Sequence, residues 1–204
     1  MRRETVLVPG ARRVEATFEE PDDGASASVV ACPPHPRYGG HRGDARLRAV
    51  SEALLERGVA CLRLDYGEWD DGLGEREDVR NACRWAADRH ERVALFGYSF
   101  GAGVAALAAA DVEVPVAALA LLAPPATVGA GLDVVAALDG VDAGVPVLAV
   151  VGARDETVSW RRVADAVTAR GGTVETVGAD HGFAGERAAV AAVVVEFLGD
   201  ALDA

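Results

Sequence analysis

The feature that most constrains the fold is a regular alternation, along 204 residues, of short apolar runs with amphipathic stretches. The runs are rich in Val, Leu and Ala, as at 93–98, which is typical of parallel strands buried on both faces. Between them, apolar residues recur with helical spacing, for example Leu47, Val50 and Leu54. This pattern predicts an α/β fold with a mostly parallel, doubly wound sheet of about seven or eight strands and helices on both faces.

Each expected element can be placed on the sequence. We expect strands at 5–8, 14–19, 28–32, 59–65, 93–98, 117–123, 145–152 and 173–177, and helices at 45–57, 75–89, 100–110, 159–170 and 186–202. The first two strands are separated by Pro9-Gly10 and are expected to form an antiparallel hairpin at the sheet edge. No repeat or linker interrupts the pattern, so we expect a single domain over residues 1–204.

The charge balance restricts the kind of partner. The formal net charge is −12, and all 20 basic residues are arginine. Nucleic acids and anionic membranes bind cationic surfaces, so neither is expected as a partner. The expected partner is a small-molecule acyl substrate. The many carboxylates and the absence of lysine are typical of a salt-adapted, halophilic chain, which predicts unfolding midpoints that rise in molar salt. The sequence carries no signal for an oligomeric state.

No apolar run has the length of a signal peptide or of a membrane span, so a cytoplasmic protein is expected. The three cysteines are Cys32, Cys61 and Cys83, which lie in apolar segments without the spacing of metal ligands. Such cysteines usually behave as small buried hydrophobes. We therefore expect neither a disulfide nor a metal, and no cofactor.

The sequence Gly97-Tyr98-Ser99-Phe100-Gly101 has the pattern Gly-x-Ser-x-Gly between an expected strand and an expected helix. That setting is the one a nucleophile elbow requires, because the serine stands on a sharp turn at the carboxyl end of a strand. At such a turn, a Cβ on either glycine would collide with the neighbouring strand or helix. Ser99 is therefore the candidate nucleophile.

A serine hydroxyl needs a base near neutral pH, and the base needs an acid to orient it. Asp155 and His181 follow the last two expected strands, and the chain order Ser, Asp, His is that of α/β-hydrolases. His181 is the candidate base and Asp155 the candidate acid. Glu156 and Asp180 are nearby alternatives for the acid.

The segment after the strand at 28–32 is a candidate for part of an oxyanion hole. In this arrangement one backbone N–H comes from that loop and the other from the residue after the nucleophile, here Phe100. Pro36 has no N–H to donate, which leaves Arg37 or Tyr38 as the second donor. Three arginines nearby are expected mainly in surface ion pairs, with binding of an anionic substrate group as the alternative: Arg37, Arg42 and Arg46.

Five motifs together resemble a compact subgroup of dienelactone-hydrolase-like α/β-hydrolases, over about residues 28–198. They are His35-Pro36-x-x-Gly39-Gly40, Gly97-Tyr98-Ser99-Phe100-Gly101, Ala123-Pro124-Pro125, Gly152-Ala153-Arg154-Asp155 and Ala179-Asp180-His181-Gly182-Phe183. The resemblance implies the α/β-hydrolase fold, with Ser99, His181 and Asp155 as nucleophile, base and acid. The connection at 124–146 has about 20 residues, so we expect no or only a minimal lid.

Two positions depart from this family. Dienelactone hydrolases proper carry a cysteine at the elbow where this chain has Ser99, so their substrate is not carried over. The loop at 65–72, which is expected to border the pocket, also differs in sequence from the corresponding loop of related small hydrolases. The sequence thus predicts a serine hydrolase that cleaves a carboxylic ester or similar acyl compound through an acyl-enzyme. The alternatives are an acyltransferase with the same triad and a non-catalytic binding or scaffold protein.

Overall fold

The computed structural model of the chain describes residues 1–203. The strands are β1 (Arg2–Val8), β2 (Val14–Glu20), β3 (Ala27–Cys32), β4 (Ala60–Leu64), β5 (Arg92–Tyr98), β6 (Val116–Leu122), β7 (Thr127–Val128), β8 (Leu132–Asp133), β9 (Val147–Gly152) and β10 (Thr173–Val177). The helices are the 3-10 turn η1 (Pro36–Tyr38), α1 (Ala45–Glu56), α2 (Leu73–Ala87), α3 (Phe100–Ala109), α4 (Val134–Gly140), α5 (Arg161–Ala169) and α6 (Arg187–Asp203).

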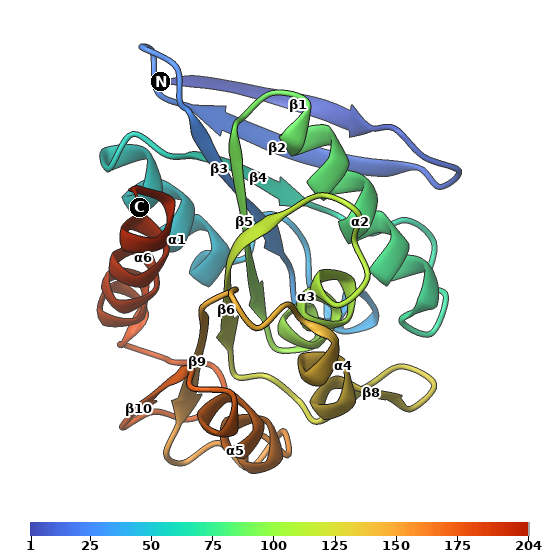
Figure 1. The fold of residues 1–204 in the computed structure, drawn as a ribbon, viewed down its shortest axis with the longest axis vertical. Helices are drawn as coiled ribbons and strands as arrows, with labels where there is room; N and C mark the ends of the chain where they lie inside the picture. The colour runs from blue at the N-terminus through green and yellow to red at the C-terminus, as the bar shows by residue number, and fades with distance from the viewer. Residues whose placement is uncertain (204) are drawn as a thin grey trace.

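Eight strands form one twisted sheet in the order β1-β2-β4-β3-β5-β6-β9-β10 (Figure 1). The hairpin of β1 and β2 is antiparallel and lies at the edge, as expected. Strand β2 also runs antiparallel to β4, whereas every pair from β4 to β10 is parallel. The predicted fold class is confirmed, and the carboxyl ends of six parallel strands meet at one edge, where doubly wound proteins place their sites.

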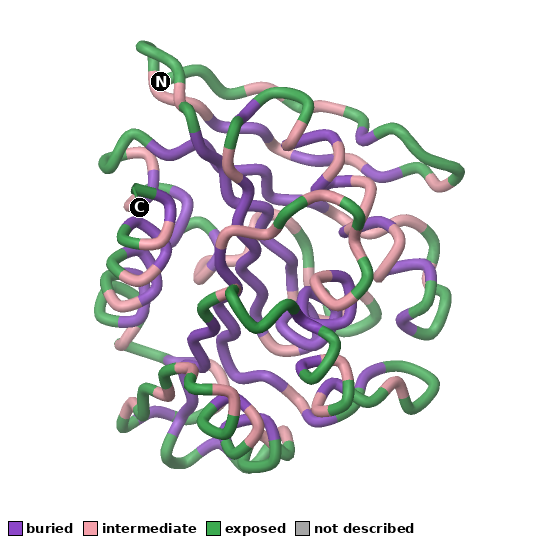
Figure 2. The backbone as a smooth tube through the Cα atoms, in the orientation of Figure 1, coloured by how far each residue is buried: buried purple, intermediate pink, exposed green. Residues whose placement is uncertain are grey.

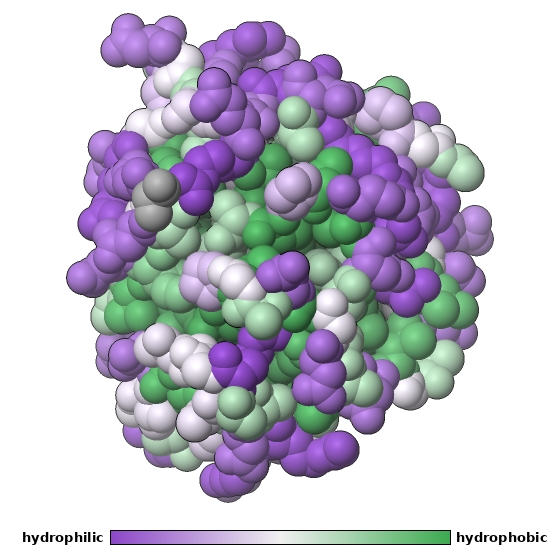
Figure 3. Space-filling view, in the orientation of Figure 1, coloured by the Kyte–Doolittle hydropathy of each residue, from purple (hydrophilic) through white to green (hydrophobic). Residues whose placement is uncertain are grey.

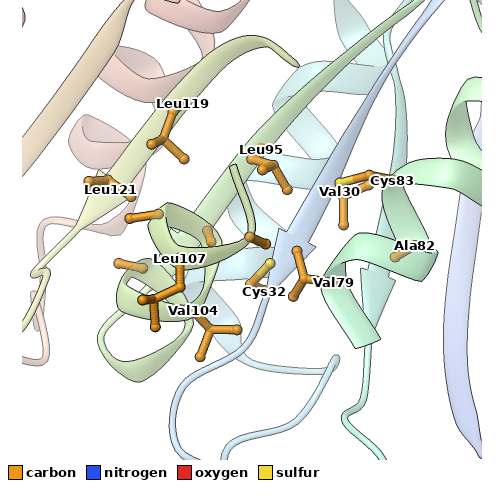
Figure 4. Packing of buried hydrophobic residues seen from close by; sticks show 14 of the residues in the cluster. Val30, Cys32, Val79, Ala82, Cys83, Leu95, Val104, Leu107, Leu119 and Leu121 are labelled. Atoms are coloured by element: carbon orange, nitrogen blue, oxygen red, sulfur yellow. The ribbon is translucent and has the colours of Figure 1, made fainter. Parts of the chain in front are cut away.

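Helices cover both faces of the sheet (Figure 1). One face is covered by α1 and α6, which pack against each other, and the other by α2, α3, α4 and α5. The central strands are buried along their length, as Figure 2 shows. Figure 4 shows the core on the α2 and α3 side, where Val79 of α2 lies near Val30 and Cys32 of β3, and Val104 of α3 belongs to the same buried cluster.

The hydropathy of the surface varies across the molecule. Figure 3 shows hydrophilic side chains around the outline of one face and apolar side chains nearer its middle. Within residues 1–203, no helix is both long enough and apolar enough to cross a membrane.

The connection from β6 to β9 contains a short β7–β8 ribbon and α4, neither of which the sequence pattern predicted. Asp133 is the N-cap of helix α4, because its carboxylate accepts hydrogen bonds from Val135 N and Ala136 N. This helix packs against α3 and α5. Among the described residues there is no lid over the carboxyl edge of the sheet, as expected.

Candidate active site

Ser99 stands between β5 and α3 on a strained backbone. Its φ of 55° and ψ of −121° are unusual for a residue with a side chain. A Cβ on Gly97 would lie 2.3 Å from the carbonyl oxygen of Gly101, and a Cβ on Gly101 would lie 2.2 Å from that of Cys32. Both glycines are therefore required for this strand, turn and helix to pack closely, as their positions in the sequence predicted.

The structure brings Ser99, His181 and Asp155 into one hydrogen-bonded chain. Ser99 Oγ lies 2.9 Å from His181 Nε2, and His181 Nδ1 lies 2.7 Å from Asp155 Oδ2. With a proton on Nδ1, the imidazole donates to Asp155 and its Nε2 accepts the serine hydroxyl. These are the contacts that proton abstraction from a serine nucleophile requires.

Asp155 is held from several sides. Its side chain is fully buried, and its Oδ1 accepts a hydrogen bond from Thr157 N at 2.9 Å. The two alternatives for the acid are placed elsewhere: Glu156 is exposed, and Asp180 Oδ1 accepts a hydrogen bond from Gly182 N at 3.0 Å. Of these three carboxylates, Asp155 is the one that orients His181.

Two side chains hold the backbone of the histidine turn. The Tyr98 hydroxyl donates to the carbonyl oxygen of His181 at 3.0 Å, and Arg46 Nη1 donates to that of Gly182, also at 3.0 Å. The Arg46 guanidinium lies 4.4 Å from the centre of the Tyr98 ring. Burial raises the pKa of Tyr98, which keeps the phenol protonated as a donor. Sequence reasoning missed this role for both residues, although Tyr98 adjoins the nucleophile.

The loop at 33–40, here called the oxyanion loop, does not offer the N–H donors that the sequence predicted. Arg37 N donates to the His35 ring at 3.2 Å, and Tyr38 N donates to the His35 carbonyl oxygen at 3.0 Å. Both N–H groups predicted as donors are thus already used within η1, so in this geometry neither is free for an oxyanion. Phe100 N opens α3, where a backbone N–H has no partner inside the helix.

His35 supplies the one N–H that the loop at 33–40 leaves without an acceptor among the described residues 1–203. A signal for this was present in the sequence, because His35 is preceded by two prolines and followed by Pro36. Prolines have no N–H, so His35 carries the first available donor after β3.

The loop at 65–72 lies behind the pocket wall and does not line the pocket, contrary to expectation. Its Trp69 stacks on the His35 ring, with centroids 4.5 Å apart and planes 26° apart. The buried Glu75 anchors the loop, because its carboxylate accepts hydrogen bonds from Asp70 N and Gly72 N. It therefore supports the oxyanion loop indirectly.

Above Ser99 lies a pocket of about 560 Å³. Its lining includes His35, Tyr38 and Phe100, from the loop at 33–40 and the start of α3, and Val128, Val158 and His181, from β7 and the loops after β9 and β10. The two charged residues in its lining, Asp44 and Arg46, form an ion pair with each other. Arg46 thus follows the expected ion-pair role, as does Arg42, which pairs with Asp65.

The described residues hold no group of three or more His, Cys, Asp or Glu side chains placed to bind a metal ion. The three cysteines are buried and free, and burial raises the pKa of the Cys61 and Cys83 thiols to about 12. These thiols lie outside the pocket lining.

No family model and no curated protein sequence matches the chain. Several solved structures are similar to the chain. An α/β serine hydrolase homologue from Coxiella burnetii is 29% identical, with 97% of this chain and 98% of that chain covered and a TM-score of 0.79. A dienelactone hydrolase from Anabaena variabilis is 24% identical, covering 97% and 96%, with a TM-score of 0.81. An α/β serine hydrolase without a lid from Xanthomonas campestris is 22% identical, covering 95% and 92%, with a TM-score of 0.78.

Proposed function

The chain has the fold of the dienelactone-hydrolase-like α/β-hydrolases, and from this premise we propose that it is a serine hydrolase of carboxylic esters or similar acyl compounds. The observation that carries the proposal is the chain of hydrogen bonds from Ser99 through His181 to Asp155, at 2.9 and 2.7 Å. A structural neighbour that is 29% identical over nearly the whole chain is a serine hydrolase homologue, which supports the same reaction class.

In the proposed reaction, Ser99 Oγ attacks the acyl carbonyl while His181 Nε2 takes the hydroxyl proton. Collapse of the tetrahedral intermediate breaks the bond to the leaving alcohol, and His181 returns the proton to its oxygen. Water then attacks the acyl-enzyme, with His181 as base again, and releases the acid and free Ser99. Asp155 keeps the proton on Nδ1 and stabilises the imidazolium that forms.

The negative charge that develops on the carbonyl oxygen needs donors that are already in place. We assign this role to the backbone N–H groups of Phe100 and His35 in place of the Arg37 or Tyr38 N–H. A helix N-terminus favours negative charge, which adds to the contribution of Phe100. One such donor typically contributes about 3 kcal/mol to the stability of the transition state.

The experiment that tests this function measures hydrolysis of a panel of short and medium acyl esters by the wild type and by Ser99→Ala. We expect the wild type to release equimolar acid and alcohol, and Ser99→Ala to lose at least about a thousandfold in kcat, since only binding and the oxyanion donors remain. Equal rates for the two proteins would rule the proposal out.

Product analysis separates hydrolysis from the alternative of acyl transfer. With a primary alcohol or amine added to the reaction, a hydrolase still yields mainly the free acid. A dominant new ester or amide would instead assign acyl transfer to the same three residues. The open pocket, which no lid covers, gives water direct access to the acyl-enzyme and supports hydrolysis.

A further inference from the structure

Tyr38 is a large aromatic side chain that the fold leaves in solvent. Its exposed fraction is 87%, which makes it the most exposed large apolar side chain of the described residues. Unlike Met1, Leu7 and Leu73, which are also exposed, Tyr38 lines the pocket above Ser99. An exposed ring at this place offers most of its surface to whatever enters the pocket.

The Tyr38 ring is the outer end of a continuous series of aromatic contacts. Its centroid lies 4.7 Å from that of His35, and His35 lies 4.5 Å from Trp69 and 4.7 Å from Phe100. Phe100 in turn meets Tyr66 edge-on at 5.7 Å. All these separations fall in the range in which aromatic pairs attract each other beyond simple burial. Within residues 1–203, His35 is the only aromatic partner of Tyr38, so the series ends at Tyr38.

The backbone under Tyr38 is fixed. The residue ends η1, in which Tyr38 N donates to the His35 carbonyl oxygen and Gly39 N donates to that of Pro36 at 3.2 Å. Gly40 follows with no room for a side chain, since a Cβ there would lie 2.0 Å from the carbonyl oxygen of Pro34. A ring on such a rigid turn loses little conformational freedom when a ligand packs on it.

The charges in the lining of this pocket are already paired or suppressed, and the Arg37 guanidinium, outside the lining, lies 6.0 Å from the centre of the Trp69 ring. Asp44 and Arg46 neutralise each other, and the Arg46 guanidinium is further committed to Gly182 and to the Tyr98 ring. Burial, together with the nearby Arg37, lowers the pKa of His35 below its ordinary 6.5, so its ring is neutral at pH 7. An uncharged, planar group therefore suits the pocket lining, which offers no unpaired charge to a carboxylate or an ammonium.

We infer that Tyr38 and His35 form a binding shelf for a planar aromatic ring, and that the substrates are uncharged esters carrying such a ring near the scissile carbonyl. This inference rests on the proposed function and names its substrate class. The shelf begins beside Phe100, which follows the nucleophile, so a ring stacked on Tyr38 would extend the aromatic series outward from the reacting carbonyl. Tyr38 would then determine specificity and take no part in the chemistry.

The test compares ligands that differ only in the planarity of one ring. Phenylpropionamide and cyclohexylpropionamide are uncharged mimics of the acyl half of an ester, and benzyl alcohol and cyclohexylmethanol mimic the alcohol half. Their dissociation constants are measured by calorimetry on Ser99→Ala, which carries no turnover. A pocket that is merely apolar would favour the saturated ring, because cyclohexyl buries at least as much apolar surface as phenyl.

We expect the planar member of at least one pair to bind about three- to tenfold more tightly, as one aromatic contact typically contributes. In the double variant Ser99→Ala, Tyr38→Leu this ratio falls to about one or below, and with Tyr38→Phe it is retained. Phenyl and cyclohexyl ligands that bind equally, or a preference that survives Tyr38→Leu, would overturn the shelf.

Rates of ester hydrolysis distinguish the aromatic shelf from the proposed hydrolase function. The ethyl esters of phenylpropionic and cyclohexylpropionic acid share a leaving group, and the acetates of benzyl alcohol and cyclohexylmethanol share an acyl group. With wild-type protein, kcat/KM should favour the aromatic member of the pair identified by binding. A binding preference without Ser99-dependent hydrolysis would refute the proposed function and leave the shelf standing. Ser99-dependent hydrolysis without any aromatic preference would refute the shelf and leave the proposed function standing.

Discussion

The two sides of the pocket are built on different principles. On the catalytic side, Asp155 and His181 are fixed by hydrogen bonds between side chains and by bonds to their own backbone turns. On the binding side, His35 and Tyr38 are positioned by a proline-containing turn and by ring stacking, and the Tyr38 ring is 87% exposed. The catalytic side thus depends on directional bonds, and the binding side on backbone shape and apolar contact.

This difference indicates which substitutions should lower kcat and which should change substrate specificity. A hydrogen bond to a charged group fails with a change of a single atom, since its strength depends on distance and direction. A stacked ring tolerates replacement by another ring and is lost only when planarity is lost.

The largest expected effect is on the catalytic side. Asp155→Asn keeps the shape of the side chain but favours the wrong tautomer of His181, so kcat should fall by about 10⁴. The matched control is Glu156→Gln, at the adjacent exposed carboxylate, which should keep kcat within about twofold. Ester hydrolysis under saturating substrate measures both. Similar losses in the two variants would mean that Asp155 has no special part in orienting the histidine.

The second effect arises where the two sides meet, at the start of α3 beside the end of β3. Gly101→Ala would place a Cβ 2.2 Å from the Cys32 carbonyl oxygen, so the free energy of unfolding should fall by about 1–3 kcal/mol or more. Gly178→Ala is the control, because a Cβ there has its nearest neighbour at 3.9 Å, on Arg154. Urea unfolding compares them. Equal stability of the two variants would show that the close approach at Gly101 is not required.

The third comparison uses one tyrosine from each side. Tyr98→Phe removes the bond to the His181 carbonyl oxygen, at 3.0 Å, and Tyr66→Phe removes one to the Pro33 carbonyl oxygen, at 3.1 Å. Each bond should contribute about 1 kcal/mol to stability. Because Tyr98, unlike Tyr66, holds the histidine turn, its variant should lose about fivefold in kcat with KM nearly unchanged. Steady-state kinetics that show the same kcat for both variants would contradict this placement.

The smallest effect is a pH dependence on the binding side. The pKa of His35 is lowered by burial and by Arg37, so on acidification from pH 6.5 the unfolded chain takes up this proton before the folded chain does. His35 should therefore contribute a small loss of stability as the pH falls through 6.5. Proton NMR titration of the histidine rings, with His35→Asn to assign the signal, measures the pKa directly. A pKa of 6.5 would mean that His35 has no such effect, and a higher value would reverse its sign.

Most of the fold and the three reactive side chains could be predicted from the sequence, because they depend on residue type and order. Apolar periodicity placed the eight sheet strands to within a few residues, and Ser99, Asp155 and His181 were identified by their positions after strands. The resemblance to dienelactone-hydrolase-like α/β-hydrolases is confirmed by the solved structures.

What the sequence did not predict depends on backbone geometry. Whether the N–H groups of Arg37 and Tyr38 are free is decided by how η1 closes on His35, which residue types alone do not specify. The β7–β8 ribbon and α4 were missed because they are short and lie in a Gly-rich segment. The loop at 65–72 was expected at the pocket, yet its Trp69 stacks on the His35 ring and its backbone is held by Glu75, which accepts a hydrogen bond from Asp70 N.

The central claim is that Ser99 is a nucleophile activated by His181, and one measurement tests it directly. The folded protein is treated with a fluorophosphonate probe, and its intact mass is followed by peptide mapping. The account predicts one covalent adduct per chain, on Ser99, with none on Ser99→Ala and much slower formation on His181→Gln. An unmodified wild type, or equal labelling of Ser99→Ala, would contradict it.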